Sequence, residues 1–336
     1  MRFLRNKIGR NGWLYAVAVI LPVVATILGV LLGGTQISLS DLAEALFGGD
    51  RSSPEARILW YVRLPRVCAS LLCGGALAVS GAVIQGVLSN RLASPSIIGV
   101  NSGAGLAVTL CAASGIAGGW RISLAAFFGA FLAVMLVSLG ARRWGATRGT
   151  VLLMGVALNA LFGAISDTVI TLFPEVSVMS NDFRIGDFSA VTYIRLIPAA
   201  ILIFLGIGIL FTLQNELEVL TLGEENAKGL GMNTGVVRVL LLLLAALLAG
   251  VAVSLAGLIS FVGLLVPHAV RRLSGGNRHL LPLCALFGAG FVTLCDTLAR
   301  WGFAPYEIPV GIVMAFLGAP FFLFILLKGR EANSHD

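Results

Sequence analysis

Long apolar runs recur along the whole of this 336-residue chain and constrain its fold more than any other feature. Runs of about 18 or more apolar residues are typical of helices that span a membrane. The composition agrees, because 58% of the residues are hydrophobic and 12% are charged, whereas roughly a quarter are charged in soluble proteins. The sequence therefore predicts an all-α polytopic membrane protein that forms one transmembrane domain over residues 1–336.

The polar breaks between the apolar runs predict about ten transmembrane helices. A polar stretch, FPEVSVMSNDFRIGDFSAVT at 173–192, separates the fifth run from the sixth and is long enough to hold a short extra helix. The predicted spans are residues 13–34, 64–88, 95–115, 121–140, 150–172, 192–213, 236–256, 259–273, 280–299 and 309–328.

The distribution of lysine and arginine predicts which side of the membrane each loop faces. With the amino terminus inside, the inner segments hold 15 of the 23 basic residues and the outer segments hold the other 8. Since basic residues concentrate in cytoplasmic loops, we expect both termini in the cytoplasm. Arg63 and Arg66, in the motif RLPR at 63–66, then lie on the outer side as exceptions to that rule.

Motifs of enzyme active sites are absent from the sequence. It contains no HExxH, GxSxG or cysteine–histidine arrangement and no GxxxxGKS/T phosphate loop. The five cysteines fall in apolar segments without a CxxC spacing, which indicates buried small side chains rather than a disulfide framework or a metal site. The basic residues are scattered, so the net charge of +7 does not indicate nucleic-acid binding. We expect no enzymatic activity and no cofactor, and energised transport would need nucleotide bound by another chain.

Ion-coupled secondary transport, an alternative from another class, would need carboxylates deep in the bilayer. Within the predicted spans only Asp167 and Asp296 are acidic, and both are near the outer ends. Asp296 precedes Arg300 by four residues, so a helical ion pair explains it without a proton relay. Neutral polar residues in the central spans suit a wide path for a bulky solute better than a site for a dehydrated ion. The candidate path residues are Gln85, Asn159 and Ser166.

The longest inner loop, QNELEVLTLGEENAKGLGMNTG at 214–235, predicts two short helices joined at Gly223. Carboxylates in the first turn of the second helix complement its dipole, and glycines end it. An apolar stripe with ordered breaks favours a docking surface for another protein over a solvated connector. The residues expected there are Leu220, Gly223, Glu224, Ala227 and Gly231, and the apolar faces also include Leu217, Leu222 and Leu230.

Four blocks of the sequence carry a family resemblance. They are RLPRVCASLLCGGALAVSGAVIQGVLSNRLASPSIIGVNSGAG at 63–105, LTLGEENAKGLGM at 220–232, GLISFVGLLVPHAVRRLSG at 257–275 and PYEIPVGIVMAFLGAPFFLFILLK at 305–328. In these blocks, which extend over nearly the whole chain, it resembles the membrane-spanning permease subunits of type II ABC importers. That family takes up iron–siderophore complexes, haem and vitamin B12.

The resemblance implies ten spanning helices per subunit and a homodimer or close heterodimer with the translocation path between its subunits. It also implies two cytoplasmic ATPase subunits, which receive the 220–232 block as coupling helices, and an external solute-binding protein. GVALNALFGAISDTV at 155–169 matches the helix that lines the path, and WGATRGT at 144–150 matches the region of the cytoplasmic gate. The implied location is the bacterial cytoplasmic membrane, in contact with its lipids.

The resemblance also implies a docking site and a cargo. In the vitamin B12 branch, arginines at the positions of Arg63, Arg66 and Arg300 contact glutamates of the binding protein, and anchoring to lipid phosphate is the alternative. The implied cargo is a ferric siderophore, the commonest in the family, with haem or cobalamin as alternatives. Gly186 and Asp187 stand where the family usually has a Gly–Ser pair, which weakens inference about the ligand from that loop.

Overall fold

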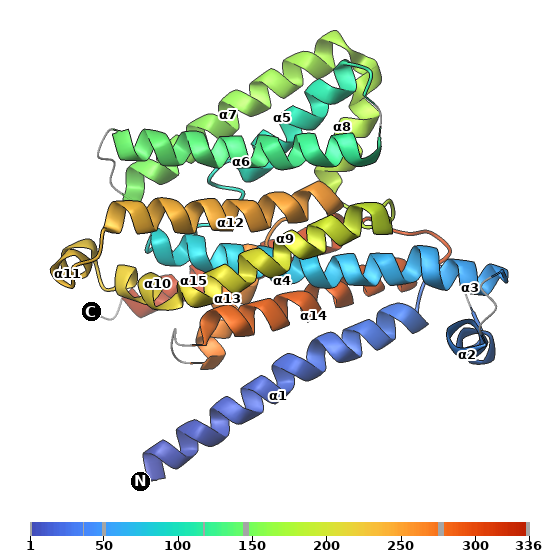
Figure 1. Cartoon of the computed structure of the whole chain (residues 1–336), viewed down its shortest axis with the longest axis horizontal. Helices are drawn as coiled ribbons and strands as arrows, with labels where there is room; N and C mark the ends of the chain where they lie inside the picture. Colours follow the sequence, from blue (N-terminus) through green and yellow to red (C-terminus); the bar gives the residue numbers. More distant parts are fainter. Residues whose placement is uncertain are drawn as a thin grey trace.

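Helices make up all the regular secondary structure in the described part of the computed structural model (Figure 1). The structure describes residues 2–35, 37–48, 52–116, 118–143, 148–274 and 279–333. Each of the ten predicted spans coincides with a helix, which confirms the all-α membrane fold. These helices are α1 (Arg2–Leu31), α4 (Leu64–Val87), α5 (Val100–Ala113), α6 (Gly119–Arg143), α7 (Arg148–Leu172), α9 (Tyr193–Thr212), α12 (Thr234–Ala256), α13 (Val262–Ser274), α14 (Leu280–Trp301) and α15 (Val310–Asn333).

The spanning helices differ in length. Among the described residues, seven helices are long and apolar enough to cross a membrane, and α5 and the first part of α15 are apolar but shorter. α13 has 13 residues and thus rises about 20 Å, less than the roughly 30 Å of a bilayer core. Left-handed residues shorten both α5 and α13: Gly99 precedes α5 at φ +99°, and Phe261 precedes α13 at φ +67°.

The shorter helices gather at the two ends of the bundle (Figure 1). α10 (Gln214–Thr221) and α11 (Glu224–Gly229) lie at one end, here named the α11 end. α2 (Leu39–Phe47), α3 (Pro54–Ile58) and α8 (Ser177–Ile185) lie at the other, here named the Arg66 end. α8 confirms the short extra helix expected between the fifth and sixth spans, and a 3₁₀ turn of three residues leads into it.

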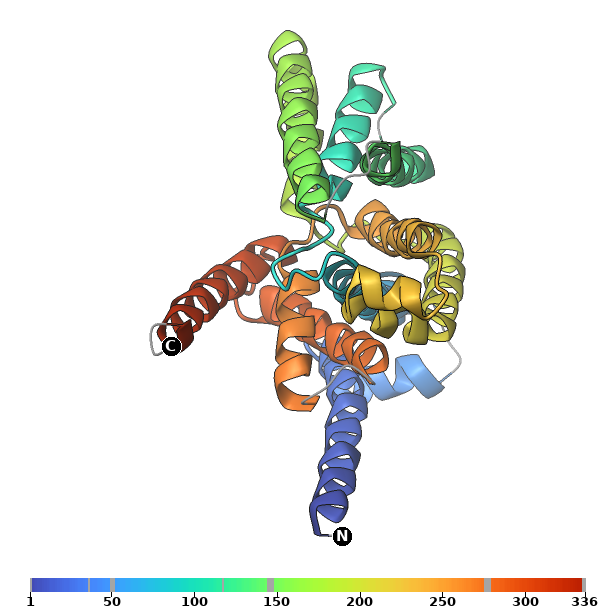
Figure 2. The ribbon, with the colours of Figure 1, turned by 90° about the vertical axis from the view of Figure 1, so that its left-hand side faces the viewer.

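α4 forms the centre of the bundle, where it packs against α12, α13 and α14 (Figure 2). Glycines permit this close packing. A methyl group at Gly74 would collide with the carbonyl group of Gly288 on α14, and one at Gly81 would collide with that of Gly263 on α13. Helices in a membrane rely on such small residues to bring their backbones together, because lipid supplies no hydrophobic force between them.

α7 lies at the edge of the bundle (Figure 2) and contacts mainly α5 and α6. Only 17% of its apolar segment is buried within the chain. The large side chains of Leu153, Val156, Leu161 and Leu172 are exposed on it. An apolar helix face of this kind is suited to lipid or to another membrane subunit.

Candidate functional site

A π-helical turn, Leu59–Arg63, leads into α4 and carries the start of the RLPR motif. Pro65 explains this turn, since proline has no backbone N–H and its ring would clash with a carbonyl group one α-helical turn earlier. A wider π turn accommodates both effects without ending the helix. The chain therefore stays helical through the motif, with Arg63 ending the wide turn and Arg66 in the first turn of α4.

Arg63, which directly precedes α4, joins the C-terminal end of α1 to the N-terminal end of α4. Its Nη1 donates to the carbonyl oxygens of Val30 at 2.6 Å and Leu31 at 3.0 Å, and its Nη2 donates to that of Thr35 at 2.6 Å. The last carbonyl groups of a helix have no partner within it, and a cation is favourable beside them. Arg63 thus caps α1, and its side chain is only 3% exposed.

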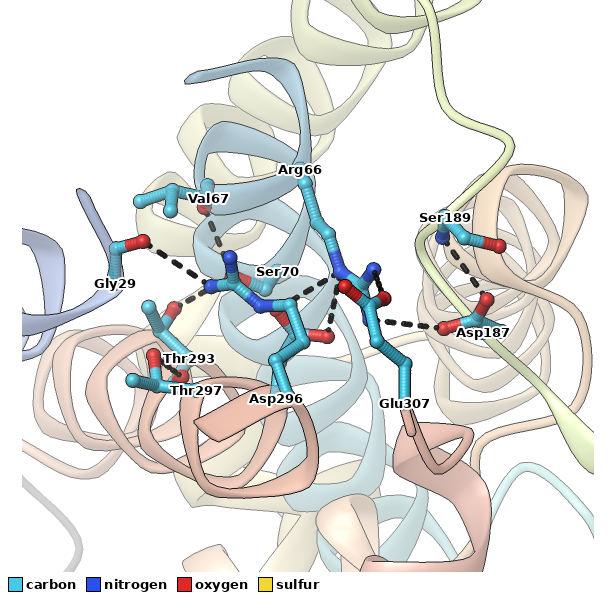
Figure 3. A network of polar contacts seen from close by, with 11 residues as sticks. Gly29, Arg66, Val67, Ser70, Asp187, Ser189, Thr293, Asp296, Thr297 and Glu307 are labelled. Carbon is cyan, nitrogen blue, oxygen red and sulfur yellow. Dashed lines mark hydrogen bonds and ion pairs between the residues drawn. The ribbon is translucent and has the colours of Figure 1, made fainter. Parts of the chain in front are cut away.

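Arg66 binds three carboxylates from different parts of the chain (Figure 3). Its Nε donates to Asp296 at 3.1 and 3.3 Å, its Nη1 to Glu307 at 2.7 Å, and its Nη2 to Asp187 at 3.2 Å. Asp296 is on α14, Glu307 in the segment between α14 and α15, and Asp187 just after α8. Arginine can serve three acceptors because its planar guanidinium directs five N–H groups outward.

Asp296 lies fully buried between two arginines. Besides Arg66, it forms an ion pair with Arg300, where Arg300 Nε lies 3.1 Å from Asp296 Oδ2. This confirms the helical pair predicted from their spacing. Arg300 also donates from Nη2 to the carbonyl oxygen of Gly29 on α1, at 3.2 Å. A carboxylate withdrawn from water needs such partners to remain charged. Arg66, Asp187, Asp296, Arg300 and Glu307 are named here the Arg66 cluster.

The predicted docking arginines lie at the end of the bundle opposite α11, but none of them is exposed. Arg63, Arg66 and Arg300 are each 2–3% accessible because their donors are used on groups of the same chain. The three arginines are thus engaged within the chain in this structure, and their contact with a binding protein remains a prediction.

The exposed side chains of the Arg66 cluster are acidic. Glu307 is 44% and Asp187 28% accessible, so a partner approaching the Arg66 cluster meets these two carboxylates before it meets Arg66 or Arg300. Sequence reasoning did not select either residue for the site. The available signal was the presence of two acidic side chains in segments expected on the same side of the membrane as RLPR.

At the α11 end, the two short helices predicted in the inner loop are present. Gly223 joins them at φ +110°, and Gly231 follows α11 at φ +82°. Glu224, the first residue of α11, accepts from Arg238 Nη2 on α12 at 2.6 Å and pairs with Lys228 at 3.1 Å. These contacts, that with Arg238 first, lower the pKa of the Glu224 carboxyl to about 2. Glu224 thus anchors α11 to α12 from within the chain.

The apolar residues of this loop divide into buried and exposed sets. Leu220 and Ala227 are buried against the chain itself, so the expectation that they face a partner directly is corrected. Leu222 and Leu230 are 62% and 69% exposed and form the apolar surface that remains open. Both exposed leucines belong to the apolar faces predicted from the sequence, and docking of another protein at this loop remains a prediction.

The three candidate path residues make structural contacts. Gln85 on α4 donates to the carbonyl oxygen of Gly263 at 3.0 Å and accepts from Arg271 on α13. Asn159 on α7 donates to the carbonyl oxygens of Ser96 and Ile97 at 3.0 and 3.1 Å, and Ser102 donates to it at 2.5 Å.

The third path residue, Ser166, bonds within its own helix, donating to the carbonyl oxygen of Phe162 at 2.8 Å. None of these contacts joins Gln85 to either α7 residue, so a shared path remains a prediction. Of the predicted gate region, residues 144–147 lie outside the described residues. In the part of the chain that the structure covers, no three His, Cys, Asp or Glu side chains are grouped to hold a metal ion.

The chain is similar along almost its entire length to membrane transport proteins. The FecCD transport family matches residues 20–328. The Fe(3+)-citrate import system permease protein YfmD of Bacillus subtilis is 37% identical over 95% of both chains. The hemin transport system permease protein HmuU of Yersinia pestis is 38% identical, covering 82% of this chain and 86% of its own length. The vitamin B12 import system permease protein BtuC of Salmonella typhi is 36% identical, covering 98% of this chain and 100% of its own length.

The fold is also similar to a solved structure of an inward-facing ABC transporter assigned to the metal-chelate type. The two superpose with a TM-score of 0.84 at 29% sequence identity, and the match covers 95% of this chain and 99% of the other. The similarity therefore extends from the sequence to the arrangement of the helices.

Proposed function

The chain belongs to the FecCD transport family, and on that basis we propose that it is the permease subunit of an ATP-driven importer for a bulky metal chelate. The observation that carries this proposal is the match over nearly the full length to permeases of ferric citrate, hemin and vitamin B12 import systems. Those relatives are transport permeases, and ATP hydrolysis is assigned here to separate subunits because the sequence has no phosphate loop.

The proposed cargo is a ferric siderophore. The Fe(3+)-citrate permease and the metal-chelate type transporter support a chelated iron ion as the transported species. Haem and cobalamin are the alternatives within the same function, since permeases of similar identity carry the names of those systems.

The α11 end is the proposed docking surface for one of the importer's two ATP-binding subunits. Leu222 and Leu230 supply exposed apolar anchors there, and Gly223 fixes the turn between the helices that carry them. The Glu224–Arg238 contact holds α11 on a long spanning helix. Motion of an attached subunit would therefore be transferred to the bundle rather than absorbed by a loose loop.

The remaining partners follow from the two other surfaces. An extracytoplasmic solute-binding protein is proposed to dock at the Arg66 end, and the exposed apolar face of α7 is proposed to meet a second permease subunit as well as lipid. With the α11 end in the cytoplasm, both termini are cytoplasmic and the protein resides in the bacterial cytoplasmic membrane. The positions of most lysines and arginines support this orientation.

Reconstitution in liposomes tests this function. The permease, its cognate ATPase and its binding protein are expected to import the loaded chelate only while ATP is hydrolysed. Thermal-shift screening of the binding protein against ferric siderophores, haem and cobalamin identifies the cargo to use. Uptake driven by a proton or sodium gradient without ATP would contradict the proposal and favour an ion-coupled transporter.

A further inference from the structure

Arg66 joins two surface segments that are far apart in the sequence to the buried ends of α4 and α14. From this arrangement we propose that Arg66 is the positioning residue of a latch, formed with Asp187 and Glu307, that holds the Arg66 end of the permease closed. The inference rests on the proposed import function, because an importer has to open at this end to admit its cargo.

The geometry of the latch places one guanidinium among three acceptors. Asp296 lies on one side of Arg66 and Asp187 on the other, while Glu307 approaches from the segment that leads into α15 (Figure 3). The bonds to Glu307 and Asp187 measure 2.7 and 3.2 Å. Among the described residues, these are the side-chain hydrogen bonds and ion pairs that join the segments at 186–192 and 302–309 to α4.

The three carboxylates differ in their access to water. Asp296 is fully buried and is shared by Arg66 and Arg300, so removing it from Arg66 would leave charges unpaired away from water. Glu307 and Asp187 are 44% and 28% exposed, so water can hydrate these two carboxylates when they separate from the arginine. Arg66 and Asp296 thus form the fixed part of the latch, and Glu307 and Asp187 form the part that releases.

Backbone hydrogen bonds make the two released segments move together. The N–H of Gly311 in α15 donates to the carbonyl oxygen of Gly186 at 3.1 Å, and the N–H of Asp187 donates to that of Ala256 at 2.8 Å. The start of α15 is therefore attached to the end of α8, and α8 in turn to the end of α12. Release of Arg66 by both carboxylates would free the segment at 186–192 and the start of α15 from Arg66 together, while α12 stays packed against α4.

Cysteine labelling of the full-length permease in nanodiscs tests the latch. Val310, the first residue of α15, is fully buried beside the segment at 302–309, so Val310→Cys in a background with the five native cysteines replaced by alanine reports opening. A membrane-impermeant maleimide is the probe. Glu307→Gln and Asp187→Asn should each be labelled about tenfold faster, the equivalent of one charge-assisted hydrogen bond.

Matched variants complete the experiment. Glu175→Gln removes an exposed carboxylate from the 3₁₀ turn at the same end and should leave the rate within about twofold of the parent. Arg66→Lys keeps the charge without the planar fork and should be labelled faster than the parent. The Glu307 and Asp187 variants avoid the folding defect expected of larger changes at Arg66.

Two results would overturn the latch. One is an unchanged labelling rate in Glu307→Gln and Asp187→Asn when both variants elute and unfold like the parent. The other is an equal acceleration in Glu175→Gln, which would reveal a general effect of charge. The assay contains no ATPase, binding protein or cargo, so its failure leaves the import function standing, and failure of ATP-driven uptake leaves the labelling result standing.

Discussion

Arg238 Nη2 lies 2.6 Å from Glu224 Oε2, so the second short helix of the α11 end is bonded to the first turns of α12. α12 runs the length of the bundle, and the carbonyl oxygen of Ala256 at its far end accepts the N–H of Asp187. One helix therefore connects the proposed ATPase surface to the Arg66 cluster. A displacement of α11 can therefore be transmitted along α12 to the end at which the cargo is proposed to enter.

The Glu224 contact predicts an acid transition confined to α11. Because the pKa of Glu224 is lowered from 4.5 to about 2, its pairing stabilises the folded loop above pH 4.5 and is lost as the pH falls through about 2. The Glu224 carboxylate is 41% exposed, so the effect on the stability of the loop should stay below about 1 kcal/mol.

A spin label at Leu230→Cys, with the native cysteines replaced, measures this transition. Its mobility should be constant from pH 7 to 5 and should increase below pH 4.5. Glu224→Gln should be mobile throughout, and a persistent transition in that variant would contradict the assignment.

The exposed leucines of the α11 end predict that substitutions there weaken ATPase binding without lowering the stability of the permease. Replacing Leu222 and Leu230 with aspartate should weaken ATPase association at least about tenfold, since a buried leucine contributes about 1.5–3 kcal/mol. The unfolding temperature of the permease alone should not change, because both side chains are exposed. Pull-down affinity and thermal unfolding measure the two effects.

Leu220→Ala is the matched control for that experiment. Leu220 is 1% exposed, and truncating a buried leucine costs about 2–5 kcal/mol of stability. Its unfolding temperature should therefore fall. Normal ATPase affinity in the Leu222 and Leu230 double variant would refute the docking surface.

The sequence predicted the positions of the ten main helices because the length and spacing of apolar runs dictate them. It was less informative about where α5 and α13 begin. A residue in the left-handed conformation, such as Phe261, delays the start of a helix without any change in hydropathy. The loop at 214–235 was predicted correctly as two helices. Helical periodicity predicted both apolar faces, but it could not tell which residues of each face pack against the spans.

The burial of the arginines could not be predicted from charge counting. Counting basic residues assigns a side of the membrane, but accessibility depends on partners distant in the sequence. Arg66 is separated by 121 residues from Asp187, by 230 from Asp296 and by 241 from Glu307. Only Asp296 and Arg300, four residues apart on one helix, could be paired beforehand.

The glycines of α4 predict a packing defect that depends on position. Gly74→Ala should lower the stability of the permease by about 1–3 kcal/mol, because the added methyl group collides with the backbone of Gly288. Gly208→Ala on α9 is the control, since a Cβ there meets no atom within 4 Å. That variant should be neutral or slightly stabilised by the better helix propensity of alanine. Equal unfolding temperatures for the two variants would contradict the close α4–α14 packing.

The buried ion pair of Arg66 and Asp296 predicts that substitutions at Arg66 lower the stability of the permease, whatever their effect on docking. Arg66→Ala removes one partner from a fully buried carboxylate and should cost about 3–5 kcal/mol, measured as thermal unfolding in detergent. Replacing Arg66, Asp296 and Arg300 together with apolar residues (Arg66→Met, Asp296→Leu and Arg300→Met) should recover much of this loss, because none of the three then leaves an unpaired charge in the interior. If both Arg63 and Arg66 are replaced with glutamate to test docking, a loss of binding would therefore also reflect the loss of folding stability. Parental stability of Arg66→Ala would show that Asp296 is not held by Arg66.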